Sequence, residues 1–262
     1  MSELTDLVLR LIEKHRARDP NHVPLIGVAG AQGSGKTYVC AELARQNPRF
    51  AHFGLDDVYF TKKERADLAK RFHPLFATRG PPGTHAVGIA FAAIATLRNA
   101  GPDDETPLPR FDKRTDDRAL EESWPRFPGR PEAILFDGWC VGALPDALGH
   151  APLNTLEAED DADGSWRQQT RADLGSRYQK FFDLFDEIIF LRAPSFEVVR
   201  AWRGQQEEET LGRPMNEAER AQLDRFIMHY ERITRSMLAG NHRGSHVVRL
   251  DEARRKILAD SR

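Results

Sequence analysis

A short glycine-rich segment near the start of the chain carries residues that could bind the phosphates of a nucleotide. It consists of Gly30, Ala31, Gln32, Gly33, Ser34, Gly35, Lys36 and Thr37 and matches the pattern G-x-x-x-x-G-K-S/T. Glycines at this spacing let successive backbone N–H groups approach phosphate oxygens, and the dipole of a following helix adds positive potential. The lysine supplies a charge for the β- and γ-phosphates, and the threonine hydroxyl is a ligand for Mg²⁺. The segment therefore predicts a nucleotide-binding loop.

The flanking residues decide between a binding loop and a glycine-rich turn that binds nothing. Residues 25–29 are a continuous apolar run typical of a buried strand, and residues 37–45 have the composition of a helix. A strand that leads through the glycines into a helix is the context that the pattern requires. The context favours nucleotide binding.

A predicted strand ends in an acid that could hold a metal ion. Residues 133–137 form an apolar run whose last residue is Asp137. The carboxyl ends of parallel strands meet at one edge of a sheet, so this carboxylate is expected beside the nucleotide loop. An ordinary acid in a turn would look the same, but with the loop upstream we predict that Asp137 and Thr37 bind Mg²⁺.

An acidic pair follows another predicted strand. Asp56 and Asp57 come directly after residues 51–55, at the same edge of a parallel sheet. A carboxylate there could accept the proton of a hydroxyl that attacks the γ-phosphate. Capping of a helix N-terminus is the alternative, because it is the common fate of such residues. We predict that Asp56 is the base, with Asp57 as the second choice.

Strands and helices alternate along the chain. Strands are predicted at 23–29, 51–55, 133–137, 187–191 and 246–250, and helices at 2–18, 36–46, 62–71, 86–100, 195–209 and 216–238. Residues 73–85 are expected to be a loop, the proline-rich segment 101–131 an extended excursion over the surface, and the acidic stretch 157–164 a mobile loop. The pattern indicates an α/β fold in one domain over 1–262, with a mostly parallel sheet covered by helices on both faces.

The composition excludes several classes of partner. The chain has 262 residues and a net charge of −2, with a pI near 6.5 and a mean hydropathy of −0.56. These values give no electrostatic footprint for nucleic acid, and no apolar stretch approaches a membrane span. The charged N-terminus does not read as a secretory signal. Cys40 and Cys140 lack metal-ligand spacing, so we expect both to be buried and the protein to be cytoplasmic.

Several motifs follow one another in an order that resembles a known family. Besides the nucleotide loop, they are the segments 56–61 (DDVYFT), 79–85 (RGPPGTH), 109–113 (PRFDK), 136–139 (FDGW) and 202–207 (WRGQQE). The succession resembles the plant- and yeast-type D-glycerate 3-kinases, a branch of the P-loop kinases that also includes uridine kinase, pantothenate kinase and phosphoribulokinase. The likeness runs from about residue 24 to about residue 238, and its middle motifs are more specific than the nucleotide loop alone.

The resemblance implies a fold, a reaction and cofactors. The fold is that of the P-loop NTPases, with a central five-stranded parallel sheet and a helical lid at about residues 197–214. The reaction is transfer of a phosphoryl group from ATP, with Mg²⁺, to a hydroxyl of a small molecule, with D-glycerate as the leading acceptor. The resemblance places the base at Asp56. The resemblance also implies a mobile lid arginine in the helix after the fourth strand, which points to Arg200 or Arg203. A monomer or a homodimer is expected.

The acceptor site is expected in the loops between about residues 73 and 118 and beside the acidic pair. Under the resemblance its candidate residues are Asp57, Tyr59, Arg79, His85, Arg110 and Lys113, and Arg118 also lies on these loops. Arg110 and Lys113 are the leading partners for a carboxylate or phosphate of the substrate. Most loop cations are simply solvated, and Trp139 and Trp202 are expected to be packing residues.

Three positions depart from the family pattern. Ala86 stands where the family usually has Asp, Asp137 stands where it has Glu, and the segment 114–118 is shorter than usual. The shorter acid keeps the metal chemistry, whereas the other two departures lie where the acceptor should bind. A nucleoside or pantothenate kinase therefore stays an alternative, as does a nucleotide-dependent ATPase or switch. The dense polar loops favour a kinase, because a switch needs no acceptor site.

Overall fold

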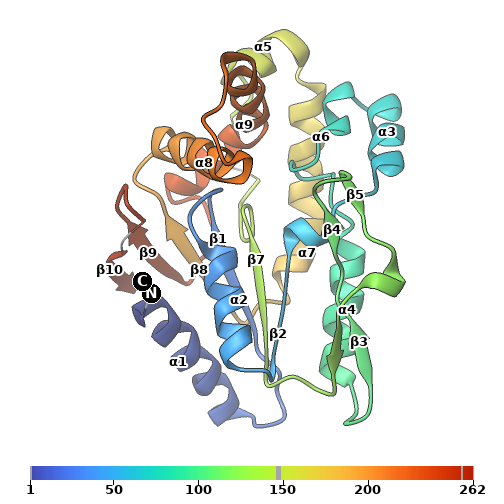
Figure 1. Cartoon of the computed structure of the whole chain (residues 1–262), viewed down its shortest axis with the longest axis vertical. Helices are drawn as coiled ribbons and strands as arrows, with labels where there is room; N and C mark the ends of the chain where they lie inside the picture. Colours follow the sequence, from blue (N-terminus) through green and yellow to red (C-terminus); the bar gives the residue numbers. More distant parts are fainter. Residues whose placement is uncertain (1, 146–148, 255, 262) are drawn as a thin grey trace.

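The structure is a computed structural model that describes residues 2–145, 149–254 and 256–261 (Figure 1). Its centre is a sheet whose strands run in the order β10-β9-β8-β1-β7-β2. Five of them are parallel: β1 (Leu25–Gly30), β2 (Phe50–Gly54), β7 (Ala133–Gly138), β8 (Glu187–Arg192) and β9 (His246–Leu250). The antiparallel edge strand β10 (Lys256–Ser261) was not predicted. The predicted α/β fold with a five-stranded parallel sheet is confirmed.

The strand order brings the polar ends of three strands together. β1 lies between β8 and β7, and β2 pairs with the other side of β7. In the register of the sheet, Asp137 of β7 lies beside Val28 of β1 and Gly54 of β2. β1 and β7 are buried along their whole length, as expected of parallel strands with helices on both faces. The nucleotide loop, the acidic pair and Asp137 consequently share the carboxyl edge of the sheet.

One face of the sheet is covered by the first two helices. α1 (Ser2–Arg18) and α2 (Lys36–Gln46) pack against a core that includes Ile26 and Val28 of β1. Successive side chains of a strand point to opposite faces, so these two residues share a face. The apolar face of α1, with Leu4, Val8, Leu11 and Ile12, is buried here.

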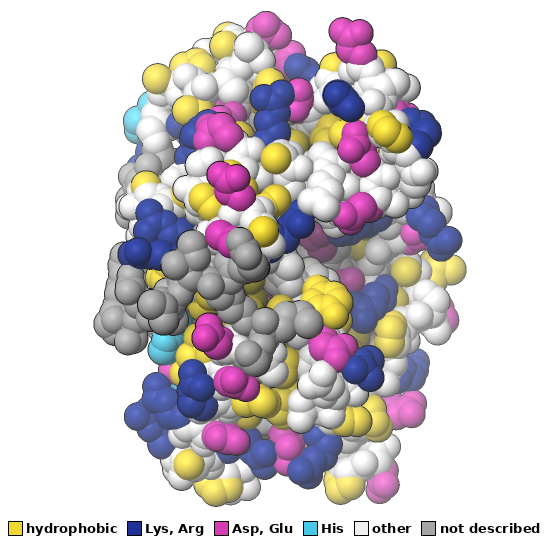
Figure 2. Space-filling view, turned by 60° about the vertical axis from the view of Figure 1, so that its left-hand side comes forward, with side chains coloured by type: hydrophobic (Ala, Val, Ile, Leu, Met, Phe, Trp, Pro, Cys, Tyr) yellow, Lys and Arg dark blue, Asp and Glu magenta, His cyan; other side chains and the backbone are white. Residues whose placement is uncertain are grey.

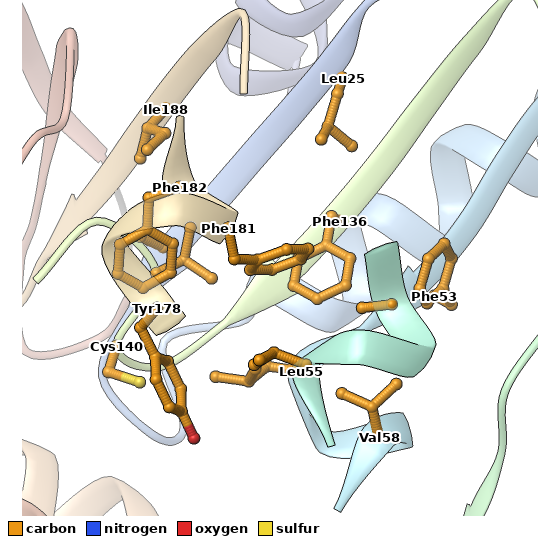
Figure 3. Close-up of a cluster of buried hydrophobic side chains, with 14 of the residues drawn as sticks. Leu25, Phe53, Leu55, Val58, Phe136, Cys140, Tyr178, Phe181, Phe182 and Ile188 are labelled. Carbon is orange, nitrogen blue, oxygen red and sulfur yellow. The ribbon is translucent and has the colours of Figure 1, made fainter. Parts of the chain in front are cut away.

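The opposite face carries the larger aromatic core. α4 (Val87–Asn99) and α7 (Gln179–Phe182) pack there. Figure 3 shows the rings of Phe53, Phe136 and Phe181 gathered between the sheet and these helices, with edge-to-face contacts at centroid distances of 5.2 Å. This core packs beneath the end of β7 that carries Asp137 and the end of β2 that leads to Asp56 and Asp57.

Two long helices lie near the carboxyl edge of the sheet. α8 (Phe196–Leu211) and α9 (Glu217–Leu238) contact each other in the upper left of Figure 1. α9 contributes Tyr230 to the aromatic core and Ile227 to the core on the other face. The helix after β8, from which a lid arginine was expected, is therefore α8.

The segment 101–131 contains two short antiparallel ribbons. β3 (Glu105–Pro107) pairs with β6 (Arg126–Pro128), and β4 (Phe111–Asp112) pairs with β5 (Asp117–Arg118). The turn of the β4–β5 hairpin carries Lys113, one of the cations of the predicted acceptor site.

The prediction of a mobile loop at 157–164 was wrong. Residues 157–160 of this stretch belong to α5 (Thr155–Asp160), and a short turn at 161–164 leads into α6 (Ser165–Asp173). Glu157 is completely buried and forms an ion pair of 2.5 Å with Arg232 of α9. Asp161 accepts hydrogen bonds from two backbone N–H groups at the start of α6, at 2.8 and 3.2 Å. The acids have partners inside the fold, and these partners order the stretch.

Shorter helical segments connect these elements. They are α3 (Lys62–Arg71), the 3₁₀ turns η1 (Leu55–Val58), η2 (Pro74–Ala77) and η3 (Glu121–Ser123), and a π-helical turn (Leu174–Tyr178) that runs into α7. η1 matters most for function, because it holds the acidic pair after β2.

The surface and the cysteines agree with the composition. On the face shown in Figure 2, basic and acidic side chains are interspersed. No helix of the described part of the chain is long and apolar enough to cross a membrane. Cys40 and Cys140 are buried free thiols, as predicted.

Candidate active site

The glycine-rich loop joins β1 to α2 and leaves open space above its last turn. Gly33 and Gly35 have left-handed φ angles of 77° and 86°, which favour glycine. A Cβ atom on Gly35 would meet nothing within 4 Å, so the start of α2 is free to receive a ligand. Lys36 Nζ lies 3.5 Å from the Ala31 carbonyl oxygen, folded over the loop. These features fit a cradle for phosphates at a helix N-terminus.

α8 and the segment after β9 support this loop from behind. A Cβ atom on Gly33 would come within 2.7 Å of Trp202 Cβ, so α8 packs directly on the loop at Trp202, whose side chain is buried. Arg254 donates a hydrogen bond of 2.7 Å to the Gly33 carbonyl oxygen and lies over the Trp202 ring. Trp202 is a packing residue, as predicted, but no pattern in the sequence pointed to Arg254.

The predicted metal ligands are in direct contact. The Thr37 hydroxyl donates a hydrogen bond of 2.6 Å to one carboxylate oxygen of Asp137. The other oxygen lies 2.9 Å from His52 Nε2. A Cβ atom on Gly54 would come within 2.9 Å of this second oxygen, so the backbone of β2 also fits closely around the acid. A hydroxyl and a carboxylate side by side are suitable ligands for Mg²⁺.

His52 is a residue to which the sequence analysis gave no role. It lies in β2 opposite Leu135, two residues before Asp137 in the neighbouring strand. A single polar residue between apolar neighbours of a buried strand was the available signal. Only the parallel register of β2 and β7 shows which carboxylate it meets.

The acidic pair divides into two different environments. Asp57 accepts the Gly54 N–H at 2.8 Å and a hydrogen bond from Arg110 at 3.0 Å. It therefore caps η1, the alternative that the sequence left open. Burial raises the pKa of Asp57, although Arg110 opposes the shift.

Asp56 faces the open side of the turn. Its Oδ1 accepts the Tyr59 hydroxyl at 2.8 Å, and its Oδ2 accepts Lys113 Nζ at 2.7 Å. Desolvation raises the pKa of Asp56, but the charges of Lys113 and Lys36 outweigh it and hold the pKa below the usual range. The acid therefore lies within electrostatic reach of Lys36 in the glycine-rich loop.

His85 is not an exposed loop residue but part of the inner wall behind Asp56. Its ring is completely buried and stacks on Tyr59 at a centroid distance of 4.6 Å. His85 Nδ1 lies 2.6 Å from the Tyr178 hydroxyl, and Nε2 has no hydrogen-bond partner within the described residues. Burial lowers the pKa of His85 to about 3, so the imidazole is neutral.

Two of the loop cations contact the acidic pair, and the other two pair with acids in other parts of the fold. Arg110 and Lys113 contact the acidic pair. Arg79 pairs with Asp116 in the β4–β5 hairpin, and Arg118 lies 3.4 Å from a carboxylate of α3.

The two lid candidates point in different directions. Arg200 pairs with Asp224 of α9 and is more than half exposed. Arg203 pairs with Glu207 at 2.8 Å and is mostly covered. Burial and Asp56 raise the pKa of Tyr230, and the charge of Arg203 opposes this shift. Arg203 therefore lies within electrostatic reach of Tyr230, which is near the acids, whereas Arg200 is held by Asp224.

Trp139 has the packing role that was expected. The indole is buried, contacts Tyr230 and donates a hydrogen bond of 3.1 Å to the Gly80 carbonyl oxygen. It ties the strand end of β7 to the loop that carries the residues before His85.

One edge of the sheet carries a phosphate loop, a hydroxyl–carboxylate pair and a second acid. This arrangement is typical of P-loop kinases, and comparison with known proteins gives the same class. No family model matches the chain. The uncharacterized kinase mug58 of Schizosaccharomyces pombe is 30% identical over 244 residues, which cover 87% of this chain and 85% of that protein. The chloroplastic D-glycerate 3-kinase of Arabidopsis thaliana is 24% identical over 95% of this chain and 58% of its own length.

A solved structure shows the same fold. The D-glycerate 3-kinase of Cryptococcus neoformans superposes with a TM-score of 0.74 at 22% identity, over 100% of this chain and 98% of that one. The chain belongs to the family of the fission-yeast kinase, within the P-loop small-molecule kinases. The likeness to D-glycerate 3-kinases predicted from the motifs is confirmed.

Proposed function

We propose that the protein transfers the γ-phosphoryl group of ATP to a hydroxyl of a small hydroxy acid, with D-glycerate as the leading acceptor. One observation carries the proposal: Thr37 of the phosphate loop contacts Asp137, and Asp56 comes two residues after Gly54, which lies beside Asp137 in the sheet. A kinase needs its acceptor base this close to the transferred phosphate. A nucleotide switch does not need it.

Thr37 and Asp137 are the residues that would hold Mg²⁺. Their oxygens lie 2.6 Å apart at the end of the loop, and hard oxygen ligands suit this ion. When bound, Mg²⁺ neutralises charge on the β- and γ-phosphates. The backbone N–H groups of residues 30–37 and the Lys36 ammonium supply the remaining positive potential.

Asp56 is the proposed base. The acceptor hydroxyl gives its proton to the Asp56 carboxylate while its oxygen bonds to the γ-phosphorus, and the bond to the β–γ bridging oxygen breaks to release ADP. The lowered pKa of Asp56 keeps this carboxylate ionised across the physiological range. Such a weak base is sufficient because the phosphoryl transition state is loose and positioning dominates. Arg203 is preferred over Arg200 as the lid cation that covers the transferring group.

The cations beside the acids support a negatively charged acceptor. The side chains of Arg110 and Lys113 are 38% and 58% exposed, so a small ligand can reach them. Both groups suit a carboxylate. The two relatives named D-glycerate 3-kinase support the same acceptor class. A cytoplasmic location, and a monomer or homodimer, stay predictions; the name of the plant relative places that protein in the chloroplast.

The test is ATP consumption over a panel of hydroxy acids, nucleosides and pantothenate, followed by Asp56→Asn. Asparagine keeps the shape of the side chain but cannot take the proton. We expect turnover with hydroxy acids and a fall in kcat of roughly 10²–10⁴-fold in the variant, with ATP affinity little changed. Asp67→Asn on the exposed surface of α3 is the control. Turnover with nucleosides alone would overturn the acceptor, and a fall of less than about fivefold would remove the base role from Asp56.

A further inference from the structure

The two oxygens of the Asp56 carboxylate have partners of opposite character. Oδ1 is held by Tyr59, a residue only 2% exposed whose ring is stacked on the buried His85. Oδ2 is held by Lys113, whose side chain is 58% exposed. The inner contact is part of the core. The outer one is an ion pair in contact with solvent, of a kind that opens easily.

The hairpin that presents Lys113 is anchored on the same wall. Phe111 packs edge to face on Tyr59 at a centroid distance of 5.2 Å. Asp116, the last residue of the turn, pairs with Arg65, which is almost completely buried, and with Arg79. The hairpin backbone is thus fixed at both ends of its turn, while the lysine stem keeps its own rotational freedom.

We propose that Lys113 makes phosphoryl transfer depend on the acceptor, by occupying the outer oxygen of Asp56 until an acceptor carboxylate draws the ammonium away. The inference rests on the proposed function and names a property of the same site. This property is the preference of the site for the acceptor hydroxyl over water, because water competes with the hydroxyl for attack on the γ-phosphorus.

Without acceptor, bound ATP would face an ionised Asp56 and bulk water. A free carboxylate oxygen at this place would orient a water molecule, accept its proton and allow attack on the γ-phosphorus, which releases inorganic phosphate and ADP. The Lys113 ammonium donates a hydrogen bond to that oxygen, so water finds no acceptor there. Idle hydrolysis is suppressed by the ion pair.

An acceptor that carries a carboxylate changes the pairing. The ammonium pairs with the carboxylate of the ligand, and the freed Oδ2 accepts the hydrogen bond of the acceptor hydroxyl. The hydroxyl proton then passes to Asp56 as the new phosphorus–oxygen bond forms and ADP leaves. A neutral alcohol cannot draw the ammonium away and would be a poor acceptor.

Arg110 does not share this role, although it lies on the same side. Its partner is Asp57, whose other contact is the backbone N–H of Gly54. Arg110 therefore touches the capping acid and not the base.

The experiment compares ATP hydrolysis without acceptor in the parent and in Lys113→Met. Methionine keeps much of the length and removes the charge. We expect phosphate release to rise at least about tenfold, a part of the roughly 10²–10⁴-fold that a positioned base supplies. The double variant Lys113→Met/Asp56→Asn should return to the parent rate. Lys63→Met, at an exposed lysine of α3, is the matched control and should leave hydrolysis unchanged.

Two outcomes would overturn the inference. One is hydrolysis by Lys113→Met at the parent rate, which would mean that Lys113 does not restrain the reaction with water. The other is a rise in hydrolysis that persists in the double variant, which would mean that the extra hydrolysis does not use Asp56. Circular dichroism of each variant shows whether it is folded. Failure of the proposed function looks different: the parent phosphorylates no hydroxy acid, whatever Lys113 does to hydrolysis. Lys113→Arg retains a cation and should hydrolyse ATP more slowly than Lys113→Met if charge is the cause.

Discussion

The metal end and the acceptor end of the candidate site are built differently. At the metal end, Asp137 and His52 have side chains that are 7% and 12% exposed, and each carboxylate oxygen has a fixed partner. At the acceptor end, Asp56 and Lys113 are 46% and 58% exposed. One end is preorganised, and the other can exchange partners.

The difference follows from the elements that supply the residues. The metal end is made by β7, β2 and the loop after β1, which are direct neighbours in the sheet. The acceptor end joins η1 to a hairpin with only two paired residues in each strand. Its Lys113 is 57 positions from Asp56 in the chain. Neighbouring strands hold the groups proposed to bind metal and triphosphate in fixed positions, whereas a hairpin can change the residues proposed for the acceptor without disturbing them.

The largest effect is expected at the nucleotide end. Lys36→Ala removes the charge over the phosphates, and we expect a loss of turnover of at least about 10²–10³-fold with the fold retained. The lysine is folded over the loop and belongs to neither core, so its removal leaves no cavity. Lys70→Ala, at a side chain 81% exposed on α3, is the control. Parent-level turnover, or an unfolded variant by circular dichroism, would contradict the assignment of the loop.

A smaller and more selective effect is expected at the acceptor end. Arg110→Ala should raise the acceptor KM by roughly 10–100-fold, the range for loss of a hydrogen bond to a charged group, and leave ATP affinity nearly unchanged. Arg110→Lys should recover only part of the loss, because an ammonium cannot form the bidentate contact.

The neighbouring Arg114→Ala, at a side chain 91% exposed that pairs within its own hairpin, controls for charge. Initial-rate kinetics with each substrate varied separately measures both constants. An equal rise in the KM for ATP and for the acceptor would place Arg110 at the nucleotide instead.

The sequence predicted the nucleotide end better than the acceptor end, for a physical reason. The loop from Gly30 to Thr37 and the strand ending at Asp137 carry their signals in consecutive residues, and the parallel sheet brings them together. The role of His52 depends on register between two strands, which no single segment encodes.

Errors arose where distant residues decide the structure. The acidic stretch 157–164 was predicted to be a mobile loop because its charges have no partner nearby in the sequence. Glu157 pairs with Arg232, 75 positions later, and is buried by that contact. The motifs name Arg79, Arg110 and Lys113 together as predicted acceptor residues, and the fold adds that Arg79 pairs with Asp116.

The smallest effect tests whether the metal end is as fixed as its contacts suggest. His52 holds one oxygen of Asp137 while Thr37 holds the other. We expect His52→Ala to weaken Mn²⁺ binding to the ATP complex by about tenfold, the lower end of the effect of outer-shell partners, since one contact persists. His52→Gln should restore part of the lost affinity, because its amide N–H can donate a hydrogen bond to Asp137.

The matched histidine–aspartate control is His22→Ala. His22 contacts Asp186 at 2.8 Å, and the two residues lie just before β1 and β8. Electron paramagnetic resonance of Mn²⁺ separates affinity from turnover, and an unchanged affinity in His52→Ala would mean that the sheet alone positions the acid.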